Sequence, residues 1–312
     1  MKKYLLCLLV CLSTVHTSRA AEFNNGTIRL VLNEKKGTFS LFSLTREARN
    51  REASPFLSHR SSINVLLNDQ AYTLGSSALF KARLGGTHSE PALIFEAENF
   101  LVTVVFSFVR TVSASLNNGV TITVNLKNTG TEPVQAALKI VLDTRKKGKQ
   151  VLSTDHGPLT TETVFDKTSS ERWWIAEDAE LSLMGNIAGA VRPDTVQIAA
   201  IATLAGAKWK PQLGSKTLPN ASGVGYYFDA RALGPDQSVA FPFILALTDD
   251  RGFAAPAFFY DTIPDTLVLK QVTALLERSL AAENSIPDET LDALEKILDR
   301  FKRQYDDRSS EY

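Results

Sequence analysis

Short runs of alternating apolar and polar residues extend from Thr27 to Leu247, and this pattern constrains the fold more than any other feature. The runs are rich in β-branched and aromatic residues and are separated by Gly, Asn, Asp and Pro, as is typical of strands joined by turns. Residues 28–32 and 38–44 alternate on either side of a turn sequence, which predicts a hairpin. Because almost no helical period intervenes, the chain is expected to be mainly β, with a large antiparallel β-sandwich.

Residues 120–126 and 134–142 form the clearest candidate pair of strands. Each has one apolar face, and a polar sequence at 127–133 joins them, so we expect the two strands to pair with each other. Further strands are expected at residues 63–67, 71–74, 79–84, 92–97, 101–112, 173–176, 181–184, 196–204, 224–230 and 239–247.

The spacing of the apolar residues changes from that of a strand to that of a helix near Pro264. Apolar residues recur at helical spacing from Leu267 to Leu280, and a second apolar stripe follows Ser285, a candidate N-cap. The sequence therefore predicts a β-sandwich domain at 21–263 and a C-terminal α-helical hairpin with a polar tail at 264–312.

The first twenty residues have the form of a secretory signal peptide. Lys2 and Lys3 precede an apolar run at residues 4–12, and Ser18-Arg19-Ala20 places small residues where a signal peptidase reads. The run is shorter than the roughly 20 residues of a membrane-spanning helix. We therefore expect cleavage after Ala20 and a periplasmic or secreted mature protein that does not span the membrane.

Composition excludes several functions for the mature chain. Cys7 and Cys11 both lie in the signal peptide, so neither a disulfide nor a thiolate remains after cleavage. Loss of residues 1–20 leaves 31 basic and 34 acidic side chains, a balance that does not attract nucleic acid. The remaining histidines are far apart in sequence and Gly-rich phosphate motifs are absent, so no metal site and no cofactor is expected.

Aromatic residues supply the candidate ligand-binding site: Trp173, Trp174, Trp209 and Tyr227. Adjacent residues of a strand point to opposite faces, so one of Trp173 and Trp174 is expected in the core and the other at the rim. The exposed one could stack on a sugar ring, although one tryptophan in the core and one at the rim, with no ligand, explains the pair more simply.

Catalytic chemistry finds little support in the sequence. Glu171, Glu177, Asp178 and Glu180 surround the tryptophan pair, and two carboxylates could flank a glycosidic bond, but sequence spacing does not fix their separation. No G-x-S-x-G motif occurs, and Asp155-His156-Gly157 completes no nucleophilic triad. No catalytic residue is assigned.

A family resemblance rests on three segments: residues 28–44, the strand pair at 61–75, and Val141-Leu142-Asp143-Thr144 after the turn at 128–130. Together they resemble large β-sandwich proteins exported by bacteria, many of unknown function. In outline they are similar to the galactose-mutarotase-like supersandwich. The resemblance implies a fold and a carbohydrate connection. A mutarotase-type site uses histidines and a carboxylate base, and His59, His88 and His156 do not match its motif.

The sequence therefore favours an exported, non-enzymatic β-sandwich protein that binds a protein partner or ligand at the cell envelope. The alternative is a carbohydrate-binding or carbohydrate-active protein of the mutarotase or glycosidase kind. Two amphipathic helices at 264–312 could also mediate self-association.

Overall fold

The computed structural model describes residues 20–34, 36–44, 61–109, 117–144, 151–177, 182–189, 191–206, 209–211 and 217–248. All of them belong to the first of the two units into which the chain divides, residues 1–258. The predicted signal peptide and the predicted C-terminal helical hairpin lie outside the described residues. Within those ranges, no helix has the length and apolar character needed to cross a membrane.

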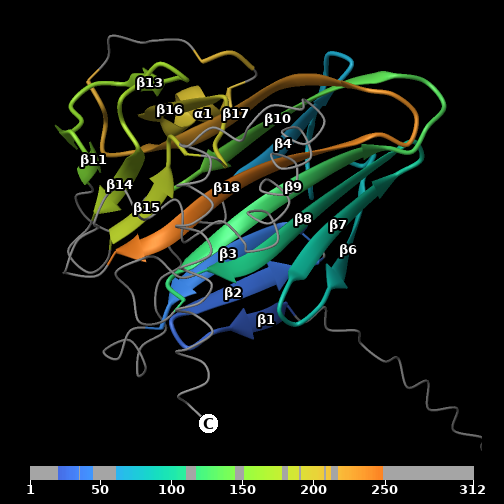
Figure 1. Cartoon of the computed structure of the whole chain (residues 1–312), viewed down its shortest axis with the longest axis horizontal. Coiled ribbons are helices and arrows are strands. Elements are labelled where there is room, and N and C mark those ends of the chain that lie inside the picture. The colour runs from blue at the N-terminus through green and yellow to red at the C-terminus, as the bar shows by residue number, and fades with distance from the viewer. Residues whose placement is uncertain are drawn as a thin grey trace, which may run out of the picture. The chain divides into compact units, whose positions relative to one another are not determined.

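The described part of the chain is mainly β, as predicted, and its strands form three sheets with antiparallel pairing (Figure 1). The three-stranded sheet has the order β1 (Ala21–Asn24), β2 (Ile28–Asn33), β3 (Thr38–Ser43). The six-stranded sheet has the order β13 (Thr163–Phe165), β16 (Thr195–Ala200), β17 (Ser222–Leu233), β10 (Val134–Leu142), β4 (Ser62–Leu67), β5 (Gln70–Thr73). The nine-stranded sheet has the order β12 (Gly157–Pro158), β11 (Val151–Thr154), β14 (Trp173–Glu177), β15 (Ser182–Asn186), β18 (Ser238–Thr248), β9 (Gly119–Asn128), β8 (Phe100–Val109), β7 (Pro91–Ala97), β6 (Lys81–Gly86).

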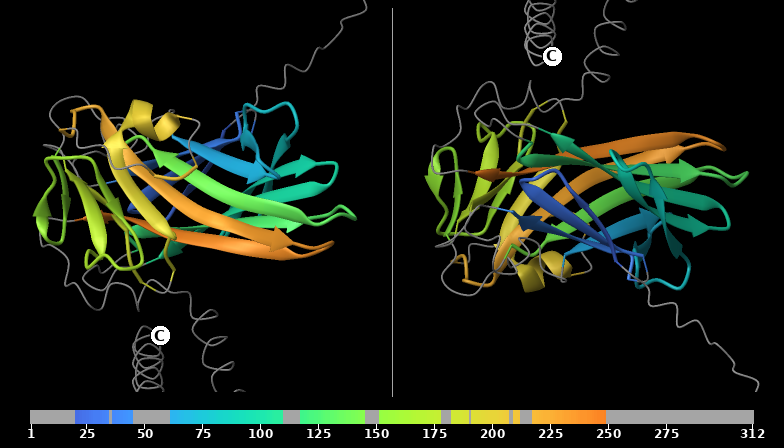
Figure 2. Two further views of the ribbon diagram at one scale, coloured as in Figure 1. Left: turned by 90° about the horizontal axis from the view of Figure 1, so that it is seen from above. Right: turned by 90° about the horizontal axis from the view of Figure 1, so that it is seen from below.

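The six-stranded and nine-stranded sheets face each other across one hydrophobic core (Figure 2). Phe228 of β17 lies 5.0 Å from Phe241 of β18 between ring centroids, and Tyr226 lies 5.1 Å from Phe243 in an edge-to-face contact. Strand alternation places these aromatic side chains on the inner faces of their sheets. The two sheets therefore form the sandwich that the alternating sequence predicted.

The three-stranded sheet packs on the same core. Its hairpin, β2 and β3, is the one predicted from residues 28–44, and Phe39 of β3 meets Phe106 of β8 at 5.0 Å. The turn that precedes β3 meets the segment that follows β5, where Gly75 closely approaches the carbonyl oxygen of Lys36. A seam therefore runs between the three-stranded sheet and the β4–β5 edge of the six-stranded sheet.

The predicted pairing of residues 120–126 with 134–142 is wrong. β9 pairs with β8 and β18 in one sheet, whereas β10 pairs with β4 and β17 in the other. Both strands have one apolar face, as expected, but those faces meet across the core instead of lying side by side. An apolar face requires burial and does not specify which strand lies beside it.

The predicted strand at 196–204 is also shorter than expected. β16 ends at Ala200, and residues Ile201–Ala205 form the short helix α1. Leu204 of α1 is buried with Val141 and Ala199 on the outer face of the six-stranded sheet. The buried carboxylate of Glu162 accepts the backbone N–H of Ala200 at 3.1 Å, which supports the first turn of the helix.

Candidate functional site

A row of five polar residues crosses the six-stranded sheet on the face that points away from the core. Thr73 pairs with Asn64, Asn64 with Lys139, Lys139 with Tyr227, and Tyr227 with Thr195. Directly opposed residues of antiparallel strands project to the same side of the sheet. The register therefore gathers residues from five strands into one feature, which we call the polar row.

The part of the polar row on β10 and β17 is buried beneath α1. Lys139 is 3% exposed; its Nζ donates to the carbonyl oxygen of Gly206 at 2.7 Å and lies 5.6 Å from the ring centroid of Tyr227. The Tyr227 hydroxyl donates to Oε1 of Gln197 at 2.9 Å. Burial lowers the pKa of Lys139 and raises the pKa of Tyr227 to about 12, because desolvation disfavours the charged form of each.

The other end of the polar row is open to solvent. Thr73 Oγ1 donates to Asn64 Oδ1 at 2.7 Å, and Asn64 Nδ2 donates to Ser62 Oγ at 3.0 Å and to the backbone carbonyl oxygen of Lys139 at 3.3 Å. The Asn64 amide thus links the buried and exposed parts of the row. Its orientation is fixed by partners on three strands, so this end of the row is rigid.

A cavity of about 200 Å³ adjoins the exposed end of the polar row, at the seam between the sheets. Three segments line it: residues 36–39, 61–63 and 73–76. We call it the seam cavity. It is smaller than the roughly 300 Å³ at the low end of pockets for drug-sized ligands, so its occupant must be small or be the end of a larger molecule.

Two glycines allow the loops around the seam cavity to approach each other. Gly37 and Gly75 have φ of +56° and +81°, a region that residues with a Cβ rarely adopt. A Cβ on Gly75 would collide with the carbonyl oxygen of Lys36, and one on Gly37 would collide with the ring of Phe95. The close contact between these loops therefore requires glycine at both positions.

The lining of the seam cavity is rich in hydroxyl groups: Thr38, Ser61, Ser62, Thr73 and Ser76. Among the described residues that line the cavity, Lys36 is the one charged residue, and none of these residues has a carboxylate or an imidazole. Hydroxyl groups both donate and accept hydrogen bonds. The arrangement can therefore hold a small polar ligand.

The structure places the predicted aromatic residues apart from one another. Trp174 is fully buried and its Nε1 donates to the Tyr226 hydroxyl at 2.8 Å in the core. Trp173 is 5% exposed, so the expectation that one tryptophan of the pair lies exposed at the rim is wrong. Trp209 is half-buried a few residues after α1, and Tyr227 belongs to the polar row. Whether any of them binds a ligand stays a prediction.

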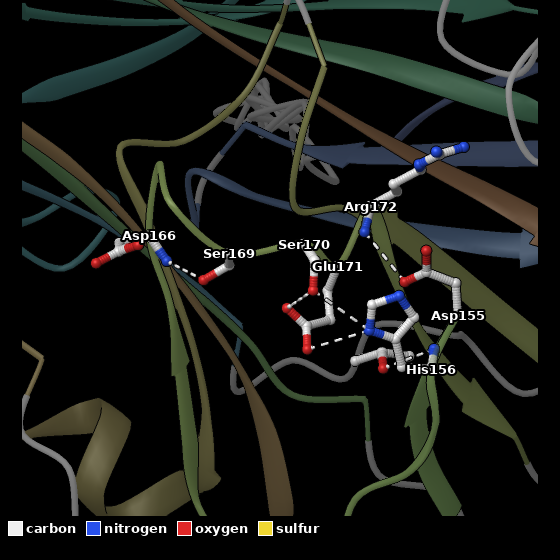
Figure 3. A network of polar contacts seen from close by, with 8 residues as sticks. Asp155, His156, Asp166, Ser169, Ser170, Glu171 and Arg172 are labelled. Atoms are coloured by element: carbon white, nitrogen blue, oxygen red, sulfur yellow. Dashed lines mark hydrogen bonds and ion pairs between the residues drawn. The ribbon is translucent and has the colours of Figure 1, made fainter.

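A second polar network connects two surface loops around His156 (Figure 3). Ser170 Oγ and Glu171 Oε1 approach the same ring nitrogen of His156, Nδ1, at 3.4 and 3.5 Å. A nucleophilic triad needs the serine on one ring nitrogen and the acid on the other. The contacts, together with the bond from Arg172 N to Asp155 Oδ1 at 3.0 Å, therefore connect loops and do not activate a nucleophile.

Of the predicted acidic residues, Glu171 and Glu177 are described, whereas Asp178 and Glu180 lie outside the described residues. In the part of the chain that the structure describes, no group of three or more His, Cys, Asp or Glu side chains is placed to hold a metal ion.

Sequence reasoning missed Lys139 and the seam cavity. The signal for Lys139 was a single charged residue in the apolar run from Ala136 to Leu142. An internal lysine there must find polar partners on the outer face of the sheet. The seam cavity offered only turn glycines and the Ser61-Ser62 pair, which sequence alone does not bring together.

Comparisons with solved structures found galactose mutarotase-like proteins among the similar chains. The chain is similar to a galactose mutarotase related enzyme from Lactobacillus acidophilus, with 9% identity and a TM-score of 0.48 over 74% of this chain and 97% of that one. It is also similar to a galactose mutarotase-like protein from Lactobacillus casei, with 9% identity and a TM-score of 0.46 over 73% of this chain and 100% of that one. No protein-family model and no curated protein matched the chain. The chain thus resembles galactose mutarotase-like proteins distantly, as expected from the sequence.

Proposed function

We propose that this protein is a carbohydrate-binding β-sandwich protein that holds a sugar at the seam cavity and acts by binding, without catalysis. The observation that carries the proposal is the lining of the cavity by five hydroxyl-bearing residues from three segments. A sugar presents several hydroxyl groups on a small ring, and each can both donate and accept. A rigid cluster of serine and threonine hydroxyl groups is complementary to such a ligand.

Binding without catalysis is supported by the residues around the cavity. Breaking or isomerising a sugar bond needs a general acid and a general base within hydrogen-bond reach of the reacting atoms. In the part of the chain that the structure describes, the residues lining the cavity include neither a carboxylate nor an imidazole. Lys139 and Tyr227, whose pKa values are shifted, are bonded to Gly206 and Gln197 under α1.

A panel of neutral and acidic monosaccharides and short oligosaccharides tests the proposal by thermal shift and calorimetry. We expect one sugar class to raise the melting temperature of the wild-type protein, because ligand binding to the folded state stabilises it. Ser62→Ala should weaken binding about fivefold, the effect of losing one hydrogen bond. Ser107→Ala, a matched serine on β8, should leave binding unchanged. If no sugar in the panel raises the melting temperature, the proposal fails.

We also propose that the protein works outside the cytoplasm after cleavage following Ala20. The first described strand, β1, begins at Ala21 and pairs with β2, so the mature chain would retain every described strand. Cell fractionation with intact-mass measurement tests this. The expected product is a periplasmic or secreted chain that begins at Ala21. A full-length chain in the cytoplasmic fraction would contradict the proposal.

A protein partner at the cell envelope, the other hypothesis from the sequence, stays a prediction. Crosslinking in intact cells followed by affinity capture would identify such a partner. Recovery of the protein alone, as a monomer, would count against it.

A further inference from the structure

The hydrogen bonds at the seam cavity give two of its serines a defined polarity. Ser61 Oγ accepts the backbone N–H of Asp143 at 3.0 Å, and Ser62 Oγ accepts from Asn64 Nδ2 at 3.0 Å. A hydroxyl group has one proton, and accepting a bond does not use it. Ser62, which lies on the same face of β4 as Asn64, can therefore donate to an occupant of the cavity, which favours a group that accepts hydrogen bonds.

The charge on the lining residues also favours an occupant that accepts hydrogen bonds. Among the described residues that line the cavity, Lys36 is the one that carries a charge, and that charge is positive. Asp143 bonds to Ser61 through its backbone N–H, is 1% exposed and does not line the cavity. A hydrogen bond to a charged acceptor is stronger than one to a neutral acceptor. An anionic group would thus gain more here than a neutral hydroxyl group.

We infer that the ligand of the seam cavity is a sugar acid, whose carboxylate receives a hydrogen bond from Ser62 and is balanced by Lys36. This inference rests on the proposed function and names the class of sugar. A carboxylate has one negative charge, which matches one lysine, whereas a phosphate ester has about −1.5 to −2 at neutral pH. The volume of about 200 Å³ limits the group to the end of a sugar or a single small ring.

Calorimetric titration with glucuronate, galacturonate, glucose, galactose and glucose 6-phosphate tests the inference on the full mature chain. A uronate should bind about tenfold more tightly than the matching neutral sugar, as a charge-assisted bond implies. Lys36→Gln should remove this preference while leaving the affinity for the neutral sugar within about twofold. Lys81→Gln on β6, a matched exposed lysine, should leave the preference intact. Added salt should narrow the gap between acid and neutral sugar.

Each other outcome overturns the inference in a distinguishable way. Equal affinity for uronate and neutral sugar would overturn the sugar acid and leave carbohydrate binding in place. Tighter binding of glucose 6-phosphate would replace the carboxylate with a phosphate. A uronate preference that survives in Lys36→Gln would place the acid elsewhere on the protein. Absence of binding to every sugar would overturn the proposed function itself.

Discussion

Lys139 occupies an otherwise apolar stretch of β10, and its neighbours determine its chemistry. Its ammonium group points away from the core. It donates to the carbonyl oxygen of Gly206 and lies over the ring of Tyr227. Removal from water lowers the pKa of the lysine and raises that of the tyrosine. These two residues therefore give opposite contributions to the pH dependence of stability.

The stability of the fold should fall as pH rises from 10.5 towards about 12, in part because of Tyr227. In this range the unfolded chain loses the phenolic proton that the folded protein keeps, since the pKa of Tyr227 is raised from 10.0 to about 12. Lys139, with a lowered pKa, contributes stability that increases up to 10.5 and so acts below this range. The free energy of unfolding, measured in urea at each pH, should fall less steeply with rising pH in Tyr227→Phe than in the wild type. If the free energy of unfolding falls with pH as steeply in Tyr227→Phe as in the control Tyr72→Phe, the role given to Tyr227 would be contradicted.

Gly75→Ala should destabilise the protein by more than about 1 kcal/mol, because the new Cβ meets the Lys36 carbonyl oxygen at a positive φ. Gly26→Ala is the matched control. Gly26 also has a positive φ, of +86°, but a Cβ there meets nothing within 4 Å. Chemical denaturation should therefore rank Gly75→Ala well below Gly26→Ala in stability. Equal losses would show that the close approach of the loops does not matter.

At the scale of elements, the connections between the two large sheets determine the topology. β9 leads into β10 and β17 leads into β18, and in each case the chain passes from one sheet to the other. Asn128, which is fully buried at the end of β9, holds these two crossings together. Its Nδ2 donates to the carbonyl oxygens of Glu132 and Leu233, and its Oδ1 accepts from the N–H of Gly130.

Asn128→Ala should cost about 2 kcal/mol or more, since it leaves buried backbone groups without partners. Asn24→Ala on the exposed edge strand β1 should change the free energy of unfolding by less than about 0.5 kcal/mol. Equilibrium unfolding in urea measures both. A cost for Asn128→Ala no larger than that for Asn24→Ala would contradict the role given to this side chain.

The strands on either side of these crossings show which parts of the fold could be predicted from the sequence. Period-two alternation identified the β2–β3 hairpin and the buried faces of β9 and β10, because burial of an apolar face is local information. It could not identify neighbours: a strand facing β10 across the core and a strand paired with it would show the same pattern. The seam cavity was hidden for a related reason, because its lining comes from three segments that only the assembled sheets bring together.

The aromatic residues failed as a guide for a different reason. Alternation predicted that one tryptophan of the pair lies in the core, which is Trp174, but it did not show that Trp173, on the opposite face of β14, is also covered. A strand pattern reports the side to which a residue points and not what lies over that side.

At the scale of the whole molecule, one core joins all three sheets, and every described element of it lies within residues 1–258. We therefore expect the sandwich to fold without residues 265–312. The helical hairpin predicted at 264–312, with its two apolar stripes, lies outside the described residues.

Deletion of residues 265–312 should leave the β-sheet circular dichroism and the melting transition in place. The difference spectrum between full and truncated chains should be helical, and light scattering should give a lower oligomeric state if the helices mediate self-association. Loss of the melting transition, or a difference spectrum without helical bands, would contradict the predicted domain division.

The central claim, that a sugar occupies the seam cavity, is tested most directly by amide chemical-shift mapping of the isotopically labelled protein during titration with uronates and neutral sugars. The account predicts shifts concentrated at residues 36–39, 61–63 and 73–76. Shifts centred instead on Trp209, or on the loops around His156, would contradict it.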